Sequence, residues 1–434
     1  MKNPTIYEDI KFTKIIGGGQ TLGELPNGKK VFAWGVLPDE TATITQTKKK
    51  SSYIEAIATE VSETSPHRVE PKDKSSYLST SPWQIVSDEQ EGHYKAALIE
   101  EAFEMHNIVL PNPIEVYTDG RAYGYRNKIE FSWWWDNDTS QLDLAFFRRG
   151  TKGKIPVEGT SLAADEINQT GIAVRDILRA RETEAYDLKT IIVRSNEEGR
   201  TTFQLYLKTK SFGDFSGSER ARLPKFVDGY EIIYSNPKSP ASVITKRLHQ
   251  HGDTSLTDTI LGTPFTYATE GFFQINIPVY EQALKDMRQY IPEKARVIDF
   301  YSGVGSIGLT IAPDDVTLVE SNEHAVREMK RNIENLGLKA RAVHATSEEA
   351  TEYITKGATI IVDPPRAGLH QKIIDTLLAV QPGRIIYLSC NPTTQARDVE
   401  LLGVAYGIKT HRGYNFFPKT PHIEHLVVLD LKEQ

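Results

Sequence analysis

Apolar and polar side chains alternate through the first part of the chain. Residues 30–34 (Lys-Val-Phe-Ala-Trp) and 42–45 (Ala-Thr-Ile-Thr) show this alternation, and residues 17–19 (three glycines) and 26–28 (Pro-Asn-Gly) interrupt it. A period of two, with turn residues between short runs, is typical of strands that bury one face. We therefore predict that residues 1–62 form a small β-barrel of short strands, similar in architecture to OB-like barrels.

From about residue 265 the pattern changes to short apolar runs separated by amphipathic segments. Strands are expected at 296–300, 316–320, 359–363 and 384–389, with a weaker one near 340–344 and a closing strand at 425–431. A helix is expected at 323–336. Apolar strands that alternate with helices indicate a parallel sheet covered on both faces. The prediction for residues 265–434 is an α/β, Rossmann-like domain.

The region between these two is expected to hold a connection and a mixed domain. Strands are predicted at 128–133, 142–147, 190–193 and 202–207, with a helix around 163–180, so residues 114–264 are assigned to a central α+β domain. Residues 63–82 are rich in Ser, Pro and Lys, as linkers are. Residues 88–106 have the pattern of a helix with Asp88 as its N-cap. Residues 63–113 are therefore assigned to a linker and a helix.

The length and composition restrict the class of protein. A chain of 434 residues is too long for one ordinary core. No run approaches eighteen apolar residues, and the start, Met1-Lys2-Asn3-Pro4, leads into polar residues, so neither a membrane segment nor a signal peptide is expected. A single cysteine excludes a disulfide framework and an all-cysteine metal site, so we expect no metal. The corresponding expectation is a cytoplasmic monomer.

Charge is distributed unevenly along the chain. The total of 51 Lys and Arg against 58 Asp and Glu gives −7, which on its own argues against a nucleic-acid partner. Residues 120–154, however, hold seven basic side chains against four acidic ones, and residues 48–50 are three lysines. Local basic patches can bind RNA in a protein of acidic total charge. Ordinary solvated surface is the alternative for each patch.

A turn that suits a nucleoside cofactor follows the first strand of the C-terminal domain. Asp299 ends that strand, and Gly303, Gly305 and Gly308 come before the next helix. Glycines allow a tight turn and let a ligand approach the backbone closely. Glu320 ends the next strand, twenty-one residues after Asp299. A carboxylate in that place can accept hydrogen bonds from ribose hydroxyls.

The cofactor could be a dinucleotide or S-adenosylmethionine. A dinucleotide needs its pyrophosphate against a helix N-terminus. The turn at Asp299 is instead acidic, which suits the ammonium group of a methionyl moiety. Asp363-Pro364-Pro365-Arg366, after a later strand, also favours S-adenosylmethionine, although a stiff turn is its plain alternative.

The one cysteine of the chain lies in a place that suits catalysis. Cys390 sits in Tyr387-Leu388-Ser389-Cys390-Asn391-Pro392, where an apolar strand runs into a loop. Ligands bind at the carboxyl ends of strands in open α/β sheets. A lone buried cysteine is more often an inert small apolar residue. The two loops at Asp299 and Asp363 reverse that preference, because they place the thiol beside the predicted cofactor.

Together these segments resemble the uracil-C5 RNA methyltransferase family, whose members form 5-methyluridine in transfer and ribosomal RNA. The resemblance covers nearly the whole chain. The matching segments are the nucleophile motif Ser389-Cys390-Asn391-Pro392, the glycine loop 299–308, Phe272-Phe273-Gln274-Ile275-Asn276, the closing motif 417–424 (Phe-Pro-Lys-Thr-Pro-His-Ile-Glu), Tyr125-Arg126-Asn127-Lys128 in the central domain, and residues 1–62, which are similar to the TRAM barrel.

This resemblance implies a reaction and the residues that perform it. The implied reaction transfers a methyl group from S-adenosylmethionine to the C5 carbon of a uridine in structured RNA, 23S ribosomal RNA or transfer RNA, through a covalent cysteine–uracil adduct. Cys390 is implied as the nucleophile and Glu424 as the general base. The implied cofactor contacts are Gln274, Tyr301, Ser306, Glu320 and Asp363. The implied RNA contacts are Arg126, Lys128 and Phe272, and RNA is the expected partner.

One departure from the family concerns a metal cluster. Many relatives carry a four-cysteine iron–sulfur cluster between the barrel and the central domain. Here Ser79-Thr80-Ser81-Pro82-Trp83-Gln84 stands where Cys-Gly-Gly-Cys-x-Trp-Gln would be expected, with Ser81 at one ligand position and Thr160 at another. Because thiolates hold such clusters, we expect no iron–sulfur cluster here.

Two other functions remain open on sequence alone. An amino-group methyltransferase could use the Asp-Pro-Pro-Arg loop at 363–366 and would not need Cys390. A catalytically idle RNA-binding or RNA-chaperone protein could use the barrel and the central domain, and would need neither Cys390 nor an intact cofactor loop.

Overall fold

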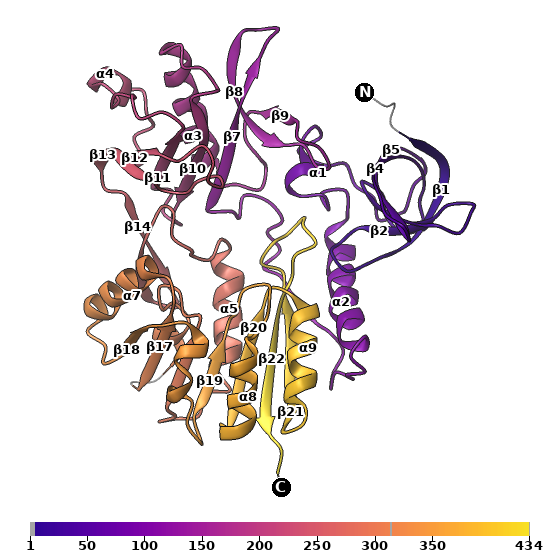
Figure 1. The fold of residues 1–434 in the computed structure, drawn as a ribbon, viewed down its shortest axis with the longest axis vertical. Coiled ribbons are helices and arrows are strands. Elements are labelled where there is room, and N and C mark those ends of the chain that lie inside the picture. Colours follow the sequence, from indigo (N-terminus) through magenta and orange to yellow (C-terminus); the bar gives the residue numbers. More distant parts are fainter. Residues whose placement is uncertain (1–4, 313–314, 434) are drawn as a thin grey trace.

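A computed structural model describes residues 5–312 and 315–433 of the chain (Figure 1). The N-terminal residues 1–4, on which the expectation about a signal peptide rested, lie outside the described residues, as do 313–314 and 434. Within the described ranges, no helix has the length and apolar character needed to cross a membrane.

The first five strands close into a barrel, which confirms the all-β prediction for this end of the chain. Their order around the barrel is β1-β2-β3-β5-β4, and β3 and β5 run parallel. The alternating apolar side chains point inward, where Phe12, Val31, Ile44 and Ile54 are buried. The strands are β1 (Ile6–Ile15), β2 (Thr21–Glu24), β3 (Lys30–Trp34), β4 (Thr41–Lys49) and β5 (Tyr53–Glu63).

A short helix and a long helix follow the barrel, at α1 (Tyr77–Thr80) and α2 (Asp88–Glu104). The predicted N-cap of the long helix is wrong by one residue. Ser87 has the extended backbone of a cap, and its side chain accepts a hydrogen bond from the Gln90 backbone N–H. Asp88 is the first helical residue, where its negative charge is favoured by the helix dipole.

The central part contains a seven-stranded sheet of order β13-β12-β11-β10-β7-β8-β9. The helix α3 (Asp165–Ala180) covers one face, where Ile167, Val174 and Ile177 pack with Phe131 and Phe203. All four strands and the helix predicted here are present. The elements are β7 (Lys128–Asp136), β8 (Gln141–Phe147), β9 (Lys154–Val157), β10 (Leu188–Ser195), β11 (Thr201–Leu207), α4 (Gly217–Arg220), β12 (Val227–Tyr234) and β13 (Lys246–Gly252).

The C-terminal sheet has eight strands in the order β18-β17-β16-β19-β20-β22-β21-β6. The five strands from β18 to β20 run parallel, as predicted, but β22 runs antiparallel to β20 because it returns directly from β21. The strands are β6 (Val116–Tyr117), β16 (Val297–Phe300), β17 (Val316–Glu320), β18 (Arg341–His344), β19 (Thr359–Val362), β20 (Arg384–Ser389), β21 (Tyr406–Tyr414) and β22 (Glu424–Leu431).

Helices cover both faces of this sheet, which confirms the α/β fold class. One face packs against α5 (Ile277–Arg288), α6 (Gly308–Ile311) and α7 (Glu323–Leu336). The other packs against α8 (Gln371–Val380), α9 (Pro392–Leu402) and also α2, through Ile99 and Phe103. The short 3-10 helices η1 (Ser347–Glu349) and η2 (Thr351–Tyr353) follow β18.

Three segments pack across the predicted domain limits, and the limits themselves stay a prediction. The helix α2 packs on the C-terminal body although it precedes the central sheet in the chain (Figure 1). The strand β6, which also precedes that sheet, pairs with β21 of the same body. The hairpin of β14 (Ser255–Ile260) and β15 (Thr263–Ala268) also packs there, because Leu256, Phe265 and Tyr267 lie in its core.

A buried ion pair fastens α2 to the loop between β21 and β22. Lys95 is fully buried, lies 2.9 Å from Glu91 and donates to the Phe417 carbonyl at 3.1 Å. Glu91 in turn accepts from the Lys419 backbone N–H at 3.0 Å and from the Asn415 amide at 3.0 Å. Both charges are therefore satisfied by each other and by the loop.

Replacing Lys95 with Met should strongly destabilise the protein. The substitution leaves Glu91 buried without its closest positive partner, and such a loss costs about 3–5 kcal/mol. Urea denaturation followed by circular dichroism measures the change. Lys14→Met removes the exposed Lys14–Glu101 pair and should cost only about 0–1 kcal/mol. Equal losses in the two variants would contradict this account.

Candidate functional site

The carboxyl ends of β16, β17, β19 and β20 open into one cavity of about 960 Å³. The cavity also borders the segment between β15 and α5 and the segment between β21 and β22. Most of the residues that the sequence singled out line it: Phe272, Gln274, Tyr301, Glu320, Asp363, Cys390 and Glu424. The topology therefore brings together motifs that are up to 152 residues apart in the chain (from 272 to 424).

The glycine turn after β16 has the backbone that the sequence predicted. Gly303 and Gly305 have positive φ angles of 56° and 89°. A Cβ on Gly308 would lie 2.5 Å from the Leu318 side chain, so any larger residue there would force its neighbours to shift. The Gly303 N–H donates to the Glu320 carboxylate at 3.0 Å, and the Asn322 N–H donates to it at 2.7 Å. These bonds hold the carboxylate at the edge of the cavity.

Three acidic side chains gather at the inner end of the cavity and its wall. Asp299 accepts one hydrogen bond, from the Gly308 N–H at 3.0 Å. Within the described ranges, its other oxygen and one oxygen of Glu424 are buried without a partner. Burial raises the pKa of Asp299 to about 8, with Asp363 and Glu320 adding to the effect. Burial also raises the pKa of Asp363 to about 7 and that of Glu424 well above its usual range.

This arrangement suits a positively charged ligand. Desolvated carboxylates that repel one another gain stability when a cation neutralises them. The unpartnered oxygens of Asp299 and Glu424 are free to accept hydrogen bonds. A cationic ligand in the cavity would meet both needs at Glu424, which lines it together with Asp363, and would lie near the fully buried Asp299 behind the wall.

Cys390 lies at the end of β20, beside the cap of α9. Asn391 caps that helix by accepting from the Thr393 N–H, and its amide donates to the Arg366 carbonyl at 2.9 Å. The loops that carry Asp363 and Cys390 are thereby joined. Burial raises the pKa of the thiol to about 11, with Glu424 and Asp363 adding and Arg366 opposing. The thiol is therefore protonated at neutral pH in the absence of a further cation.

The segment that delivers Glu424 is held by its neighbours on several sides. Thr420 donates to the Phe417 carbonyl at 2.7 Å, which closes a tight turn. The barrel also reaches this segment, since the Gly19 Cα lies so close to Pro421 that a Cβ there would sit 2.1 Å from the proline ring. Glu424 itself is the first residue of β22, opposite Tyr414 of β21.

His422, in the same segment, is neutral. Burial, followed by the positive charges of Arg366, Arg126, Lys95 and Arg149, lowers its pKa to about 4. Four cationic side chains are therefore near the His422 ring, although Lys95 among them is buried and paired with Glu91. The three arginines among them can attract RNA phosphates.

The remaining predicted residues lie behind the cavity wall. The Ser306 hydroxyl is 2.8 Å from the Tyr280 hydroxyl. Lys128 donates to the Gly271 carbonyl at 3.4 Å, and burial lowers its pKa to about 8. Arg126 lies over the ring of Tyr125, whose hydroxyl donates to the Pro418 carbonyl at 3.0 Å. These three do not line the cavity, and their assigned roles stay predictions.

The two positions compared with cluster ligands lie in one polar cluster. Asp73 accepts from Thr160 at 2.9 Å and from Gln84 at 3.0 Å, and Gln84 also donates to Ser81 at 2.7 Å. Among the residues described, no group of three or more His, Cys, Asp or Glu side chains is placed to hold a metal ion.

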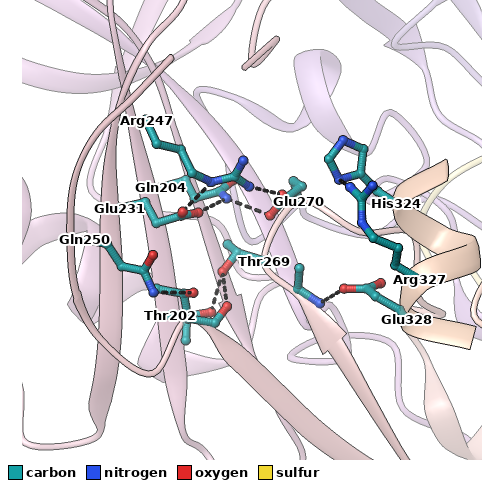
Figure 2. A network of polar contacts seen from close by, with 12 residues as sticks. Thr202, Gln204, Glu231, Arg247, Gln250, Thr269, Glu270, His324, Arg327 and Glu328 are labelled. Atoms are coloured by element: carbon teal, nitrogen blue, oxygen red, sulfur yellow. Dashed lines mark hydrogen bonds and ion pairs between the residues drawn. The ribbon is translucent and has the colours of Figure 1, made fainter. Parts of the chain in front are cut away.

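Several cavity residues were not assigned a role from the sequence. Arg366 is the last residue of the Asp-Pro-Pro-Arg motif at 363–366. Arg247 and Glu270 come from the central part and from the segment after β15, and Glu328 comes from α7 (Figure 2). Their local sequences carry no signal of the cavity, because they meet only through the tertiary fold.

Comparisons with known proteins agree with this geometry. A family model described as tRNA (Uracil-5-)-methyltransferase matches residues 349–432, which include the segments of Asp363, Cys390 and Glu424. A second, described as Methyltransferase small domain, matches residues 282–383, which include the glycine turn.

Full-length relatives and a solved structure resemble the chain over most of its length. A protein of Enterococcus faecalis described as an uncharacterized RNA methyltransferase is 28% identical, covering 92% of each chain. One of Bacteroides thetaiotaomicron with the same description is 27% identical, covering 94% of this chain and 98% of its own. The crystal structure of Pyrococcus abyssi tRNA (uracil-54, C5)-methyltransferase with S-adenosyl-L-homocysteine has a TM-score of 0.78 at 20% identity, covering 97% of this chain and 100% of that one. That likeness shows that the fold is shared.

Replacing Asp299 with Asn should weaken the pH dependence of stability. The pKa of Asp299 is raised to about 8 in the folded chain, whereas an unfolded Asp titrates near ~3.9. The folded state therefore holds an extra proton between these values, so this group's contribution falls as pH rises, by up to about 1.4 kcal/mol per pH unit.

Asn carries no such proton. The melting temperature of Asp299→Asn should decline less than that of the wild type between about pH 5.5 and pH 8, measured by scanning calorimetry. Parallel declines in the two proteins would show that Asp299 is ionised in the folded state.

Proposed function

We propose that this chain, which belongs to the uracil-C5 RNA methyltransferase family, methylates the C5 carbon of a uridine in transfer or ribosomal RNA through a covalent adduct at Cys390. The observation that carries the proposal is that the only thiol of the chain shares a cavity with the buried carboxylate of Glu424 and with the glycine turn. That combination is what thiol addition to C6, methyl transfer to C5 and removal of the C5 proton require.

The residues of the cavity fit S-adenosylmethionine. Glu320 is held where it can accept hydrogen bonds from ribose hydroxyls, and Gln274 and Tyr301 line the same space. Asp299 and Asp363 supply negative charge for a cationic ligand, and one Asp299 oxygen has no partner among the described residues. When bound, S-adenosylmethionine supplies a methyl group on a sulfonium sulfur. Ser306 lies behind the turn and would support it through Tyr280.

Cys390 acts first in the proposed reaction. The thiol loses its proton and its sulfur forms a bond to uracil C6, which moves an electron pair toward C5 as an enolate. Ionisation needs a nearby positive charge, because the thiol pKa is raised to about 11. Arg366 is the side chain whose charge opposes that rise, and it lines the cavity with Cys390. We therefore assign the stabilisation of the thiolate to Arg366.

Glu424 acts last in the proposed reaction. After C5 has accepted the methyl group, the carboxylate removes the C5 proton, and the electron pair of that C–H bond re-forms the C5–C6 double bond. The sulfur of Cys390 leaves as thiolate. Burial raises the pKa of Glu424, so the carboxyl group must be ionised before this step, and once ionised it binds a proton more strongly than an exposed carboxylate does.

RNA recognition is proposed for the surface that surrounds the mouth of the cavity. The target base must leave its stack to reach Cys390. Phe272 is 69% exposed at the cavity wall and is placed to stack on a base. Arg126, Arg149 and Arg366 lie near His422 and can contact phosphates, while Lys128 is proposed to act through Gly271.

The protein is proposed to work without an iron–sulfur cluster. Hydrogen bonds around Asp73 join the segment after the barrel to the central domain, and the two positions compared with cluster ligands, Ser81 and Thr160, take part in them. These contacts connect the same two parts of the chain that a cluster would connect.

Cys390→Ala and Glu424→Gln should fail at different steps. Cys390→Ala should bind RNA but form neither adduct nor 5-methyluridine, because no sulfur can add to C6. Glu424→Gln should add the thiol and accept the methyl group, then stall with RNA attached. Denaturing gel electrophoresis and nucleoside mass spectrometry measure both outcomes.

The wild-type enzyme provides the matching positive control. RNA containing 5-fluorouridine should trap it covalently, since fluorine cannot leave as a proton. If Cys390→Ala still methylates RNA, the covalent mechanism is wrong and an amino-group methyltransferase becomes the better account. If the wild type binds RNA but shows no turnover, the protein is an RNA-binding protein.

Glu320→Ala should weaken cofactor binding by about 1–3 kcal/mol through loss of hydrogen bonds to the ribose. Isothermal titration calorimetry with S-adenosylmethionine measures the change. Glu323→Ala is the matched control. Glu323 is the first residue of α7, three residues after Glu320, and it forms an exposed ion pair with Arg327. An unchanged affinity of Glu320→Ala for S-adenosylmethionine would show that Glu320 does not bind the ribose.

A further inference from the structure

The segment 268–274, from the end of β15 toward α5, carries two of the site residues predicted from the sequence, Phe272 and Gln274. Ala268, Glu270, Gly271, Phe272 and Gln274 all line the cavity. The segment has no regular secondary structure beyond Ala268. Its shape must therefore come from contacts with its surroundings.

Arg194, at the end of β10 in the central sheet, makes the densest of these contacts. Its side chain is completely buried. One terminal nitrogen donates to the carbonyls of Ala268, at 3.3 Å, and Gly271, and the other donates to the Phe273 carbonyl at 3.0 Å. Its guanidinium also lies 4.6 Å from the ring of Tyr267, which stacks on Phe273 at 4.1 Å.

The partners of this buried charge are unusual. A buried arginine is ordinarily paired with a carboxylate. Within the described part of the chain, Arg194 forms no ion pair, and its hydrogen-bond partners are backbone carbonyls of the segment. Burial lowers its pKa, which nearby Tyr267 and Asp258 partly offset. A planar fork of donors is the group that can bind several carbonyls at once.

Other side chains hold the same segment from two directions. From the central part, Gln204 donates to Glu270 at 2.7 Å and Arg247 donates to it at 2.6 Å (Figure 2). Asn127 donates to the Gln274 carbonyl at 2.9 Å. From the C-terminal domain, Glu328 of α7 accepts from the Ala268 N–H at 2.7 Å. The segment is thus held from both the central sheet and α7, and Arg194 contacts three of its backbone carbonyls.

We propose that Arg194 is a positioning residue for the reaction, which fixes the backbone of segment 268–274 so that Gln274 and Phe272 face the cavity. This inference rests on the proposed function, because it assigns Gln274 to the cofactor. It makes cofactor affinity depend on a residue of the central sheet that touches neither cofactor nor RNA.

The test compares Arg194→Met and Arg194→Lys with the wild type and with Arg175→Met. Arg175 is also a buried arginine of the central part, but it pairs with Glu158 and Asp176, away from the segment. Three measurements are made on the full chain: the Kd of S-adenosylmethionine by calorimetry, KM and kcat with RNA, and hydrogen exchange of the 268–274 amides.

Arg194→Met should raise Kd and KM for S-adenosylmethionine about tenfold or more, while kcat at saturating cofactor changes less than about threefold. Exchange should quicken in 268–274 but not in β11. Arg194→Lys keeps a charge but only part of the fork, so it should lie between Arg194→Met and the wild type. Arg175→Met should lower the melting temperature and leave KM unchanged.

Unchanged Kd and unchanged exchange in Arg194→Met would overturn the positioning role. If Arg194→Met does not fold, the test rests on Arg194→Lys. A wild-type Kd and wild-type exchange in Arg194→Lys would then overturn the positioning role. An equal rise of KM in Arg175→Met would show that the effect of Arg194→Met comes from general destabilisation and not from positioning of the segment. Failure of the proposed function would look different, since the wild type itself would then form no adduct with 5-fluorouridine RNA.

Discussion

The antiparallel pairing of β20 with β22 sets the geometry on which the site depends. Ser389 pairs with His425 in this register. Cys390 follows Ser389 and Glu424 precedes His425, so the two lie at the same end of the antiparallel strands. A slip of one residue would turn Glu424 to the opposite face of the sheet. The register is supported from within, because the buried His425 ring contacts Gln395 and His411, and Gln395 donates to the backbone of both strands. Local hydrogen bonds thus fix the relation between two groups that are 34 positions apart (390 and 424).

The cavity combines this geometry with a deficit of positive charge. Acidic side chains approach from β16, β19 and β22, and the surrounding apolar atoms disfavour their ionisation. The raised pKa values of Asp299, about 8, and of the Cys390 thiol, about 11, favour their protonated forms at neutral pH. A cation bound nearby would favour the ionised forms of these groups. Arg366 lies near Cys390 and Glu424, where its positive charge opposes the rise of both pKa values, and it lines the cavity together with Asp363.

Much of the scaffold could be predicted from the chain, because strands and turns leave local patterns. The parallel strands were placed within one residue, and the barrel followed from the alternation of residues 30–34. The N-cap of α2 was missed because Ser87 and Asp88 are both capping residues, and only the backbone angles distinguish them. Arg194, Glu91 and Lys95 could not be found this way. Glu91 and Lys95 pair four residues apart on α2, but their contacts with the loop between β21 and β22, like those of Arg194 with segment 268–274, come from distant parts of the chain. A buried charged residue also has no periodic signature that separates it from a surface one. The antiparallel direction of β22 was missed for a similar reason, since apolarity alone does not report strand direction.

The contact between Gly19 and Pro421 changes how the barrel should be regarded. The first turn of the barrel lies directly on the segment that leads into Glu424, and Trp83 joins the two by donating to the carbonyls of Gly19 and Lys419. The barrel therefore packs against the segment that leads into Glu424, behind the residues that line the cavity. Exchange of this barrel between related proteins, by recombination or by design, would have to keep a glycine at position 19, because a side chain there would collide with Pro421. The order of the domains along the chain suggests independent units, but the barrel and the C-terminal part are in direct contact at Gly19 and Pro421.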